Sequence, residues 1–302
     1  MFSVIICTYN RDKYIYQTLK RIACNKIETG KYEIILVDNN STDNTELECR
    51  RFVADYPEVN YFYFKELNQG LSYARNRGVK ESRGDVLVFL DDDSFVNDDY
   101  LSNLQNYIDN YPDAMAFGGK ITPLFEDGIT PKWLCSWNYS WVSAIDMGKK
   151  VAVFKSGKYP IGANMGVKKE CVDRCGLFNT NLGRTKKNLM GGEEKDFFNR
   201  VKDNGFTIYY FPDIEVNHLI PPSRTTKEYI EKLGHGIGLS EYRRCKDISG
   251  ISLVKRRIAE LVKWAATIVL WFFYMLIFRI KVGNMLVVFR YNVSKGLFGG
   301  MD

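Results

Sequence analysis

The sequence VLVFLDDDS, residues 86–94, joins a run of five apolar residues directly to three consecutive aspartates. A continuous β-branched and aromatic run is typical of a short strand that is buried on both faces of a parallel sheet. The pattern predicts a strand over residues 86–90 with the aspartates at its carboxyl end. Carboxylates this close repel one another, and a bound divalent cation would remove the conflict. The alternative is a solvated loop in which Asp93 or Ser94 caps the next helix.

Segments typical of strands and helices alternate along the first 118 residues. The expected strands are 2–7, 32–37, 61–65, 86–90 and 114–118, and the expected helices are 13–23, 42–54, 71–81 and 98–110. This βαβα order predicts an α/β fold with a mostly parallel, Rossmann-like sheet and helices on both faces. Ligands of such sheets bind at the carboxyl ends of the strands.

Polar clusters follow three of the expected strands. They are Thr8-Tyr9-Asn10-Arg11, the segment DNNSTD at 38–43, and the aspartates at 91–93. Each cluster alone could be a helix cap, because Asn, Ser, Thr and Asp are favoured at that position. All three fall on one rim of the predicted sheet, so together they predict a binding site there.

The second half of the chain is less regular. Trp133, Trp137 and Trp141 indicate either a substrate-facing aromatic region or a packed loop, and GANMG at 162–166 is a loop that permits close approach to a ligand. The segment GGEEKDFFNRV, from residue 191, places carboxylates before a helical pattern, where they could simply complement the helix dipole. A histidine ends a strand-like run at VNH, 216–218, and could equally be a core residue.

Composition indicates a globular chain of one large domain with an appendage, since its 302 residues are 45% hydrophobic and 14% aromatic. The seven cysteines are odd in number and scattered, as expected of reduced thiols in a cytosolic compartment. The chain enters a strand from Met1 without a basic region or cleavage site, so we expect no secretory signal. Function on the cytoplasmic side is therefore expected.

The net charge of +6 is concentrated in the last 52 residues, which carry eight basic and two acidic side chains. A basic tail could bind nucleic acid. This tail, however, also contains WAATIVLWFFYMLIF, residues 264–278, which has no charge, and the combination indicates an anionic membrane surface instead of nucleic acid. Fifteen helical residues rise about 22 Å, short of the hydrocarbon core, so an interfacial or re-entrant anchor is expected. A true span and an oligomer contact are the alternatives.

The order of these motifs resembles the family 2 inverting glycosyltransferases of the GT-A fold, of the bacterial capsular, O-antigen or exopolysaccharide type. The resemblance covers roughly residues 1–245. The segments that carry it are SVIICTYNR (3–11), EIILVDNNSTDNT (33–45), NQGLSYARNRGVKESRGDVLVFLDDDS (68–94), GANMGVKKE (162–170), GGEEKDF (191–197) and VNHLIPPSR (216–224).

The resemblance implies a role for each matching residue. The residues implied to bind the nucleotide sugar are Thr8, Tyr9, Asn10, Arg11, Asp38, Asn68, Gly70, Arg75, Asp91 and Asp92. Asp93 and His218 are implied to hold Mn²⁺ or Mg²⁺, which suits oxygen ligands and diphosphate. Glu194 stands at the position of the catalytic base, with Glu193 as the second choice. The family more often has Glu-Asp here, so the base of this chain is one methylene longer.

The implied activity is a metal-dependent hexosyl transfer. Its donor would be a nucleotide sugar, expected to be a UDP-sugar, and its acceptor a hydroxyl of a glycan or lipid-linked acceptor in surface polysaccharide synthesis. The expected organisation is a GT-A domain over 1–245, divided into a nucleotide-sugar half (1–120) and an acceptor and catalytic half (121–245), followed by a membrane-associating helical tail over 246–302. The expected place of work is the cytoplasmic face of the bacterial inner membrane.

Two other functions compete with this one. A sugar-nucleotide nucleotidyltransferase would need a glycine-rich basic loop after the first strand, whereas this chain has CTYNRDKY, residues 7–14, without glycine. A non-catalytic membrane-associated sugar-binding protein would be expected to have lost a carboxylate of the metal or base site, but Asp91, Asp93 and Glu194 are all present.

Overall fold

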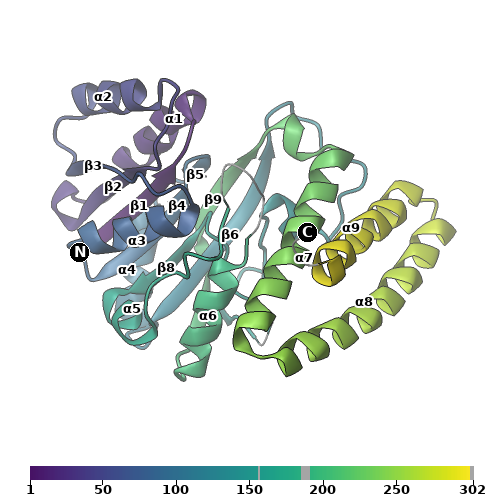
Figure 1. The fold of residues 1–302 in the computed structure, drawn as a ribbon. Coiled ribbons are helices and arrows are strands. Elements are labelled where there is room, and N and C mark those ends of the chain that lie inside the picture. The colour runs from purple at the N-terminus through teal and green to yellow at the C-terminus, as the bar shows by residue number, and fades with distance from the viewer. Residues whose placement is uncertain (156, 185–190, 300–302) are drawn as a thin grey trace. The chain divides into compact units, whose positions relative to one another are not determined.

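A computed structural model describes residues 1–155, 157–184 and 191–299 of the chain (Figure 1). The chain forms two compact units. The first unit comprises Met1–Pro123, Ser143–Thr180 and Glu193–Leu219, and the second comprises Leu124–Val142, Asn181–Gly192 and Ile220–Asp302.

The first unit is built on four parallel strands in the order β3-β2-β1-β4. Their bounds are β1 Phe2–Thr8, β2 Tyr32–Asp38, β3 Tyr61–Lys65 and β4 Val86–Asp91. In the register of the sheet, Thr8 pairs with Asp38 and Cys7 pairs with Asp91. The three polar clusters of the sequence therefore start side by side, as the predicted strands require.

Helices cover both faces of these strands. They are α1 Asp12–Ala23, α2 Thr45–Asp55, α3 Leu71–Glu81 and α4 Tyr100–Asn110 (Figure 1). Val4 and Ile6 of β1 pack into one core with α1, α2 and α4, while Ile5 packs into the opposite core with α3. Because successive side chains of a strand point to opposite faces, a strand covered on both sides must be apolar throughout.

The sheet continues beyond β4 in the order β4-β8-β6-β9-β5, with antiparallel pairing of β8 with β4 and β6 and of β9 with β5 and β7. Their bounds are β5 Ser94–Val96, β6 Ala116–Phe125, β7 Ala152–Val153, β8 Met165–Lys168 and β9 Ile208–Ile220. The expected α/β fold is confirmed, and β1 pairs in parallel with β2 and β4, as β2 does with β3, whereas β4 pairs antiparallel with β8. Antiparallel pairs need no crossover helix, which agrees with the irregular sequence of the second half.

In the described part of the chain, further helices and short 3₁₀ turns precede the C-terminal helices. They are α5 Lys169–Cys175, α6 Glu193–Asp203, and the short turns Thr29–Lys31, Tyr139–Val142 and Pro222–Arg224. Helix α6 begins directly at the acidic pair Glu193 and Glu194 and packs Phe197 and Phe198 into the same core as α3. The helical pattern after GGEE in the sequence is thereby confirmed.

The second unit consists mainly of α7 Lys227–Ile248, α8 Gly250–Leu276 and α9 Ile280–Gly299. Helices α7 and α9 pack closely because glycines face the partner backbone. A Cβ on Gly238 would lie 2.1 Å from the carbonyl oxygen of Val293, and one on Gly296 would lie 2.3 Å from that of His235. Only glycine permits so close an approach.

A buried ionic cluster joins the three C-terminal helices. Glu260 of α8 is fully buried and binds Arg256 at 2.8 Å and Arg290 of α9 at 3.1 Å. Arg256 also binds Glu241 of α7 at 2.8 Å. Helices α8 and α9 are thus packed on α7, and the functional boundary at residue 245 stays a prediction.

The tryptophans of the second unit do not share one environment. Trp133 and Trp141 are buried with ring centroids 5.9 Å apart, and Trp141 stacks on Phe289 of α9 at 4.0 Å. Trp137 is exposed. The packed-loop interpretation therefore holds for Trp133 and Trp141.

Helix α8 has a broad apolar surface exposed to solvent. Among the described residues it is the one helix long and apolar enough to cross a membrane, and only 17% of its apolar 18-residue stretch is buried. Its 27 residues rise about 40 Å, longer than expected from the uncharged segment alone, because the helix also includes the charged residues before Trp264. The chain turns back at Phe278, which is 90% exposed at φ 55°.

Candidate functional site

The aspartates after β4 and the end of β9 form a cluster of metal-ligand type in the first unit. Ligand atoms of Asp91, Asp93 and His218 all lie within 4.8 Å of one another. The Nε2 atom of His218 lies 3.0 Å from Asp93 Oδ1 and 3.8 Å from Asp91 Oδ2. Strand β5 brings these groups together, because its residue Ser94 pairs with His218 on β9.

This cluster fits a divalent cation. His218 is fully buried, and neither of its ring nitrogens makes a well-aligned hydrogen bond to any residue in the described part of the chain. A buried imidazole without such a partner is costly, and a cation bound between it and two carboxylates would satisfy it. Two carboxylates and an imidazole are ligands of divalent metals in proteins.

Asp92 is directed away from this cluster. Its Oδ1 accepts a hydrogen bond from Arg11 Nε at 3.2 Å, and its backbone oxygen accepts one from Thr18 Oγ1 at 2.7 Å. Burial raises the pKa of Asp92 to about 6, although the Arg11 guanidinium opposes the shift. Arg11 Nη2 also lies 3.6 Å from Asp93 Oδ2. Arg11 therefore offsets part of the negative charge of the triplet.

The loops after β1 and β2 are tied to each other. The Asn10 backbone N–H donates to Ser41 Oγ at 3.0 Å, and the Thr42 backbone N–H donates to Asn10 Oδ1 at 2.8 Å. Asn10 adopts φ 53°, a left-handed conformation that asparagine tolerates. Thr8 is buried and Tyr9 is half-buried beside it. The polar clusters are thus a connected rim, and the residues at the N-caps of α1 and α2, Arg11 and Asn44, form no side-chain cap hydrogen bond.

Asp38 is buried and stabilises this rim through hydrogen bonds to other residues of the protein. Its Oδ1 accepts from the Ser41 backbone N–H at 2.8 Å, and its Oδ2 accepts from the Tyr63 hydroxyl at 2.6 Å. Both carboxylate oxygens therefore have partners within the protein. The contact of Asp38 with a nucleotide stays a prediction.

Asn39 was not singled out in the sequence, yet it organises the loop before α3. Its Oδ1 accepts from the Gly70 backbone N–H at 2.8 Å, and its Nδ2 donates to the carbonyl oxygens of Asn68 at 2.7 Å and Glu66 at 3.0 Å. Gly70 adopts φ 147°, which other residues rarely adopt. The only signal in the sequence was a polar residue directly after a buried strand.

Arg75 of α3 binds both carboxylates at the start of α6. Its Nη1 lies 2.8 Å from Glu193 Oε1, and its Nη2 lies 3.1 Å from Glu194 Oε1, which also accepts from the Gly162 backbone N–H at 3.2 Å. Burial alone would lower the pKa of Arg75, but Glu194 and Glu193 raise it above its ordinary value. The sequence placed Arg75 among nucleotide-sugar ligands, and the structure places it against the two glutamates.

The two glutamates differ in what they can do. Glu193 is almost fully buried, whereas the Glu194 side chain is 17% exposed. A general base must reach a substrate proton, so this geometry favours Glu194 over Glu193. Gly162 makes the arrangement possible, because a Cβ there would lie 1.9 Å from Arg75 Nη2 and 2.7 Å from Glu194 Oε1. The GANMG loop, where the sequence indicated close approach of a ligand, is thus approached closely by the side chains of Arg75 and Glu194.

Comparison with known proteins extends these observations. A family model described as "Glycosyl transferase family 2" matches residues 3–175. The glucosyl-dolichyl phosphate glucuronosyltransferase of Haloferax volcanii is 25% identical over 235 residues, which are 76% of this chain and 72% of that protein. The succinoglycan biosynthesis protein ExoM of Rhizobium meliloti is 26% identical, over 75% of this chain and 69% of that protein.

A solved structure shares the fold of this chain. The mannosyltransferase PcManGT from Pyrobaculum calidifontis, in complex with GDP-Man and Mn²⁺, superposes with a TM-score of 0.64 at 17% identity, covering 99% of this chain and 88% of that one. At this identity the likeness concerns the fold alone. With the sheet order described above, the GT-A fold expected from the sequence is confirmed.

Proposed function

Because the chain belongs to glycosyl transferase family 2, we propose that it transfers a hexosyl residue from a UDP-sugar to a hydroxyl of a glycan or lipid-linked acceptor. It is a glycosyltransferase that acts on nucleotide sugars in polysaccharide synthesis. The observation that carries the proposal is the convergence of Asp91, Asp93 and His218 within 4.8 Å, in the same unit as the partly exposed carboxylate of Glu194.

The proposed metal is Mn²⁺ or Mg²⁺, held by Asp93 and His218 with Asp91 facing the nucleotide. Such a cation stabilises negative charge on the departing nucleoside diphosphate. Arg11 adds a fixed positive charge beside Asp92 and Asp93. One guanidinium beside one potential cation site supports the proposal that the diphosphate binds here.

The proposed base is Glu194. One carboxylate oxygen, Oε1, is held by Arg75 and by the Gly162 backbone N–H, which leaves Oε2 for the acceptor proton. As Glu194 takes that proton, the acceptor oxygen bonds to the anomeric carbon from the face opposite the diphosphate. The bond from the anomeric carbon to the diphosphate oxygen breaks in the same displacement, so the configuration inverts. Arg75 acts as a positioning residue for the base in this scheme.

The proposed nucleotide pocket is the rim formed by Thr8, Tyr9, Asn10 and Arg11, with the further residues Asp38, Asn68, Gly70, Arg75 and Asp92. The mutual ties between the loops after β1 and β2 support a preformed pocket, since the backbone there is fixed before a ligand binds. Asp38 would act chiefly by holding Ser41 and Tyr63.

The proposed location is the cytoplasmic face of a bacterial inner membrane, where α8 and α9 lie on or partly within the lipid. The large exposed side chains Val269, Phe272, Phe273 and Leu276 on α8, followed by Phe278, support this contact. Vesicle flotation tests it: wild type should float with anionic vesicles, and Val269→Asp/Phe273→Asp should not. A wild-type protein that stays in solution without detergent and does not float with anionic vesicles would refute it.

A donor screen tests the activity. Purified full-length protein is incubated with a panel of UDP- and GDP-sugars, with and without Mn²⁺, and the released product is identified. Metal-dependent release of nucleoside diphosphate supports the proposal. Release of pyrophosphate would identify a nucleotidyltransferase, and donor binding without any release would identify a sugar-binding protein.

A further inference from the structure

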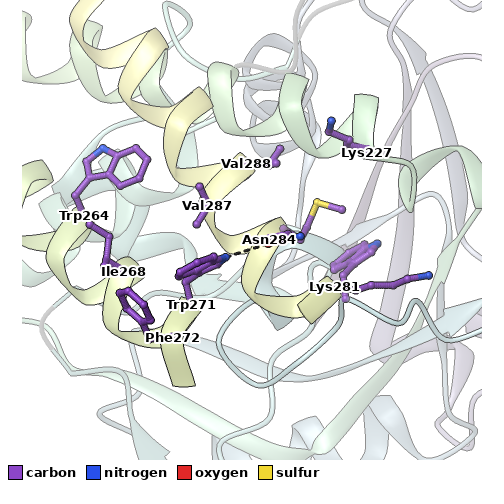
Figure 2. A pocket seen from close by; sticks show the side chains of 11 residues that line it. Lys227, Trp264, Ile268, Trp271, Phe272, Lys281, Asn284, Val287 and Val288 are labelled. Carbon is purple, nitrogen blue, oxygen red and sulfur yellow. Dashed lines mark hydrogen bonds between the residues drawn. The ribbon is translucent and has the colours of Figure 1, made fainter. Parts of the chain in front are cut away.

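The second unit contains an apolar cavity bounded by α8 and α9, with a volume of about 790 Å³. Figure 2 shows Trp264, Ile268 and Phe272 of α8 on one side of it, and Val287 and Val288 of α9 nearby. Pockets that bind small molecules typically have volumes of about 300 to 1,000 Å³. The cavity is therefore large enough for a hydrocarbon chain.

Lys227, Lys281 and Asn284 interrupt this apolar lining, and none of the described residues that form it carries a carboxylate. In Figure 2, Lys227 and Lys281 lie on the side of the cavity away from Trp264 and Phe272. Lys281 makes no hydrogen bond or ion pair with any residue in 1–155, 157–184 or 191–299. Lys227 has only an exposed contact with Glu231 at 3.7 Å, which contributes little. An anion can therefore be bound at this end of the cavity.

The positions of the lysines in their helices support an anion independently. Lys227 is the first residue of α7 and Lys281 the second residue of α9. The N-terminus of a helix carries partial positive charge, so a lysine there opposes the helix dipole. Helix α7 has Glu228 in its first turn, but α9 has no acidic residue there. A bound anion would offset this unfavourable arrangement.

The cavity is continuous with the exposed apolar surface of α8. Ile268 and Phe272 line the cavity and are also 47% and 58% exposed, and the neighbouring Val269 and Phe273 are exposed as well. A molecule with both a long chain and an anionic group fits this combination. Such a molecule could enter from a lipid layer without leaving an apolar environment.

We propose that this cavity binds one molecule of a long-chain lipid phosphate from the membrane. Its hydrocarbon chain lies against Trp264, Ile268 and Val288, and its phosphate binds Lys227 and Lys281. The inference rests on the proposed function only in that a lipid-linked acceptor has this same chemistry, a phosphate on a long chain.

Native mass spectrometry of the full-length protein in a neutral detergent tests the inference, with hexadecyl phosphate as the probe. We expect one retained probe per chain, and neither inorganic phosphate nor hexadecyltrimethylammonium should be retained. Lys227→Glu/Lys281→Glu should weaken retention about tenfold or more, because it reverses two charges that face the phosphate. Val288→Trp should weaken it similarly by filling the cavity. The matched control is Lys232→Glu, an exposed lysine of α7 outside the cavity, which should bind as wild type does.

Several outcomes would overturn the inference: no retained probe on the wild-type protein, equal retention by either cavity variant, or equal retention of the cationic amphiphile. Thermal unfolding and calorimetric donor binding show whether each variant is folded, and Lys227→Glu/Lys281→Glu keeps the test decisive if Val288→Trp does not fold. Donor turnover without probe retention counts against the cavity alone. Probe retention without donor turnover counts against the proposed enzyme alone.

Discussion

Substitution of Gly162 by alanine tests the arrangement of the proposed base most directly. The added Cβ would lie 1.9 Å from Arg75 Nη2, whereas ordinary contact begins at 3.4 Å, so the guanidinium must retreat by about 1.5 Å. The same Cβ would lie 2.7 Å from Glu194 Oε1 and would displace that carboxylate as well. Arg75 is buried and bound to Glu193, so it has little freedom to move away without breaking an ion pair.

The expected magnitudes follow from this overlap. A misplacement of about 1 Å in a catalytic arrangement costs on the order of 10²-fold in rate, so kcat of Gly162→Ala should fall about 100-fold. Overpacking a buried site costs about 1–3 kcal/mol of unfolding free energy. Calorimetric binding of the nucleoside diphosphate should weaken less than kcat falls, because the three atoms nearest to the added Cβ belong to Arg75 and Glu194 and to none of the proposed metal ligands.

The matched control is Gly30→Ala, since a Cβ at Gly30 would meet nothing within 4 Å. Steady-state kinetics of both variants and of wild type, with donor binding measured separately, decide the outcome. Wild-type turnover in Gly162→Ala, together with a lowered melting temperature, would show that the contact of Arg75 and Glu194 with this loop is structural and has no part in transfer.

Three further predictions concern charged groups. Asp93→Ala should abolish transfer and nearly abolish metal-dependent binding of nucleoside diphosphate in calorimetric titration. Asp92→Ala should have a milder effect, because Asp92 faces Arg11. Equal metal dependence of binding in wild type and Asp93→Ala refutes the ligand assignment. Glu194→Gln should lower kcat on the order of 10²-fold with donor binding preserved, and a larger loss in Glu193→Gln would mean that the base is misassigned. Glu260→Ala leaves Arg256 with Glu241 alone and removes the ion pair of Arg290, so it should lower the unfolding free energy by about 3 kcal/mol or more, measured by denaturant titration. An unchanged midpoint would contradict the role of this cluster.

Local pattern in the sequence determined the core elements of the first unit. The segments 61–65 and 71–81 match β3 and α3 residue for residue, and the strand expected at 86–90 ends one residue later as β4. These elements were predictable because a strand covered on both faces must be apolar throughout, and a surface helix must repeat its apolar residues every three or four positions. The motifs also sufficed for the family and the fold, which the comparisons confirm.

Tertiary structure alone decided which distant groups meet. His218 reaches Asp93 because β9 pairs antiparallel with β5. Antiparallel strands need no crossover helix, so the sequence between them contains no helical pattern from which this pairing could be predicted. Arg75 meets Glu193 and Glu194 across more than a hundred residues of sequence. Position 162 requires glycine, because a Cβ there would overlap the side chains of Arg75 and Glu194. The tail, similarly, was visible as basic and apolar, but the burial of Glu260 among arginines from neighbouring segments depends on how three helices pack. Local propensity fixes the period of each element, whereas such contacts depend on strand register and helix packing, which no short stretch of sequence encodes.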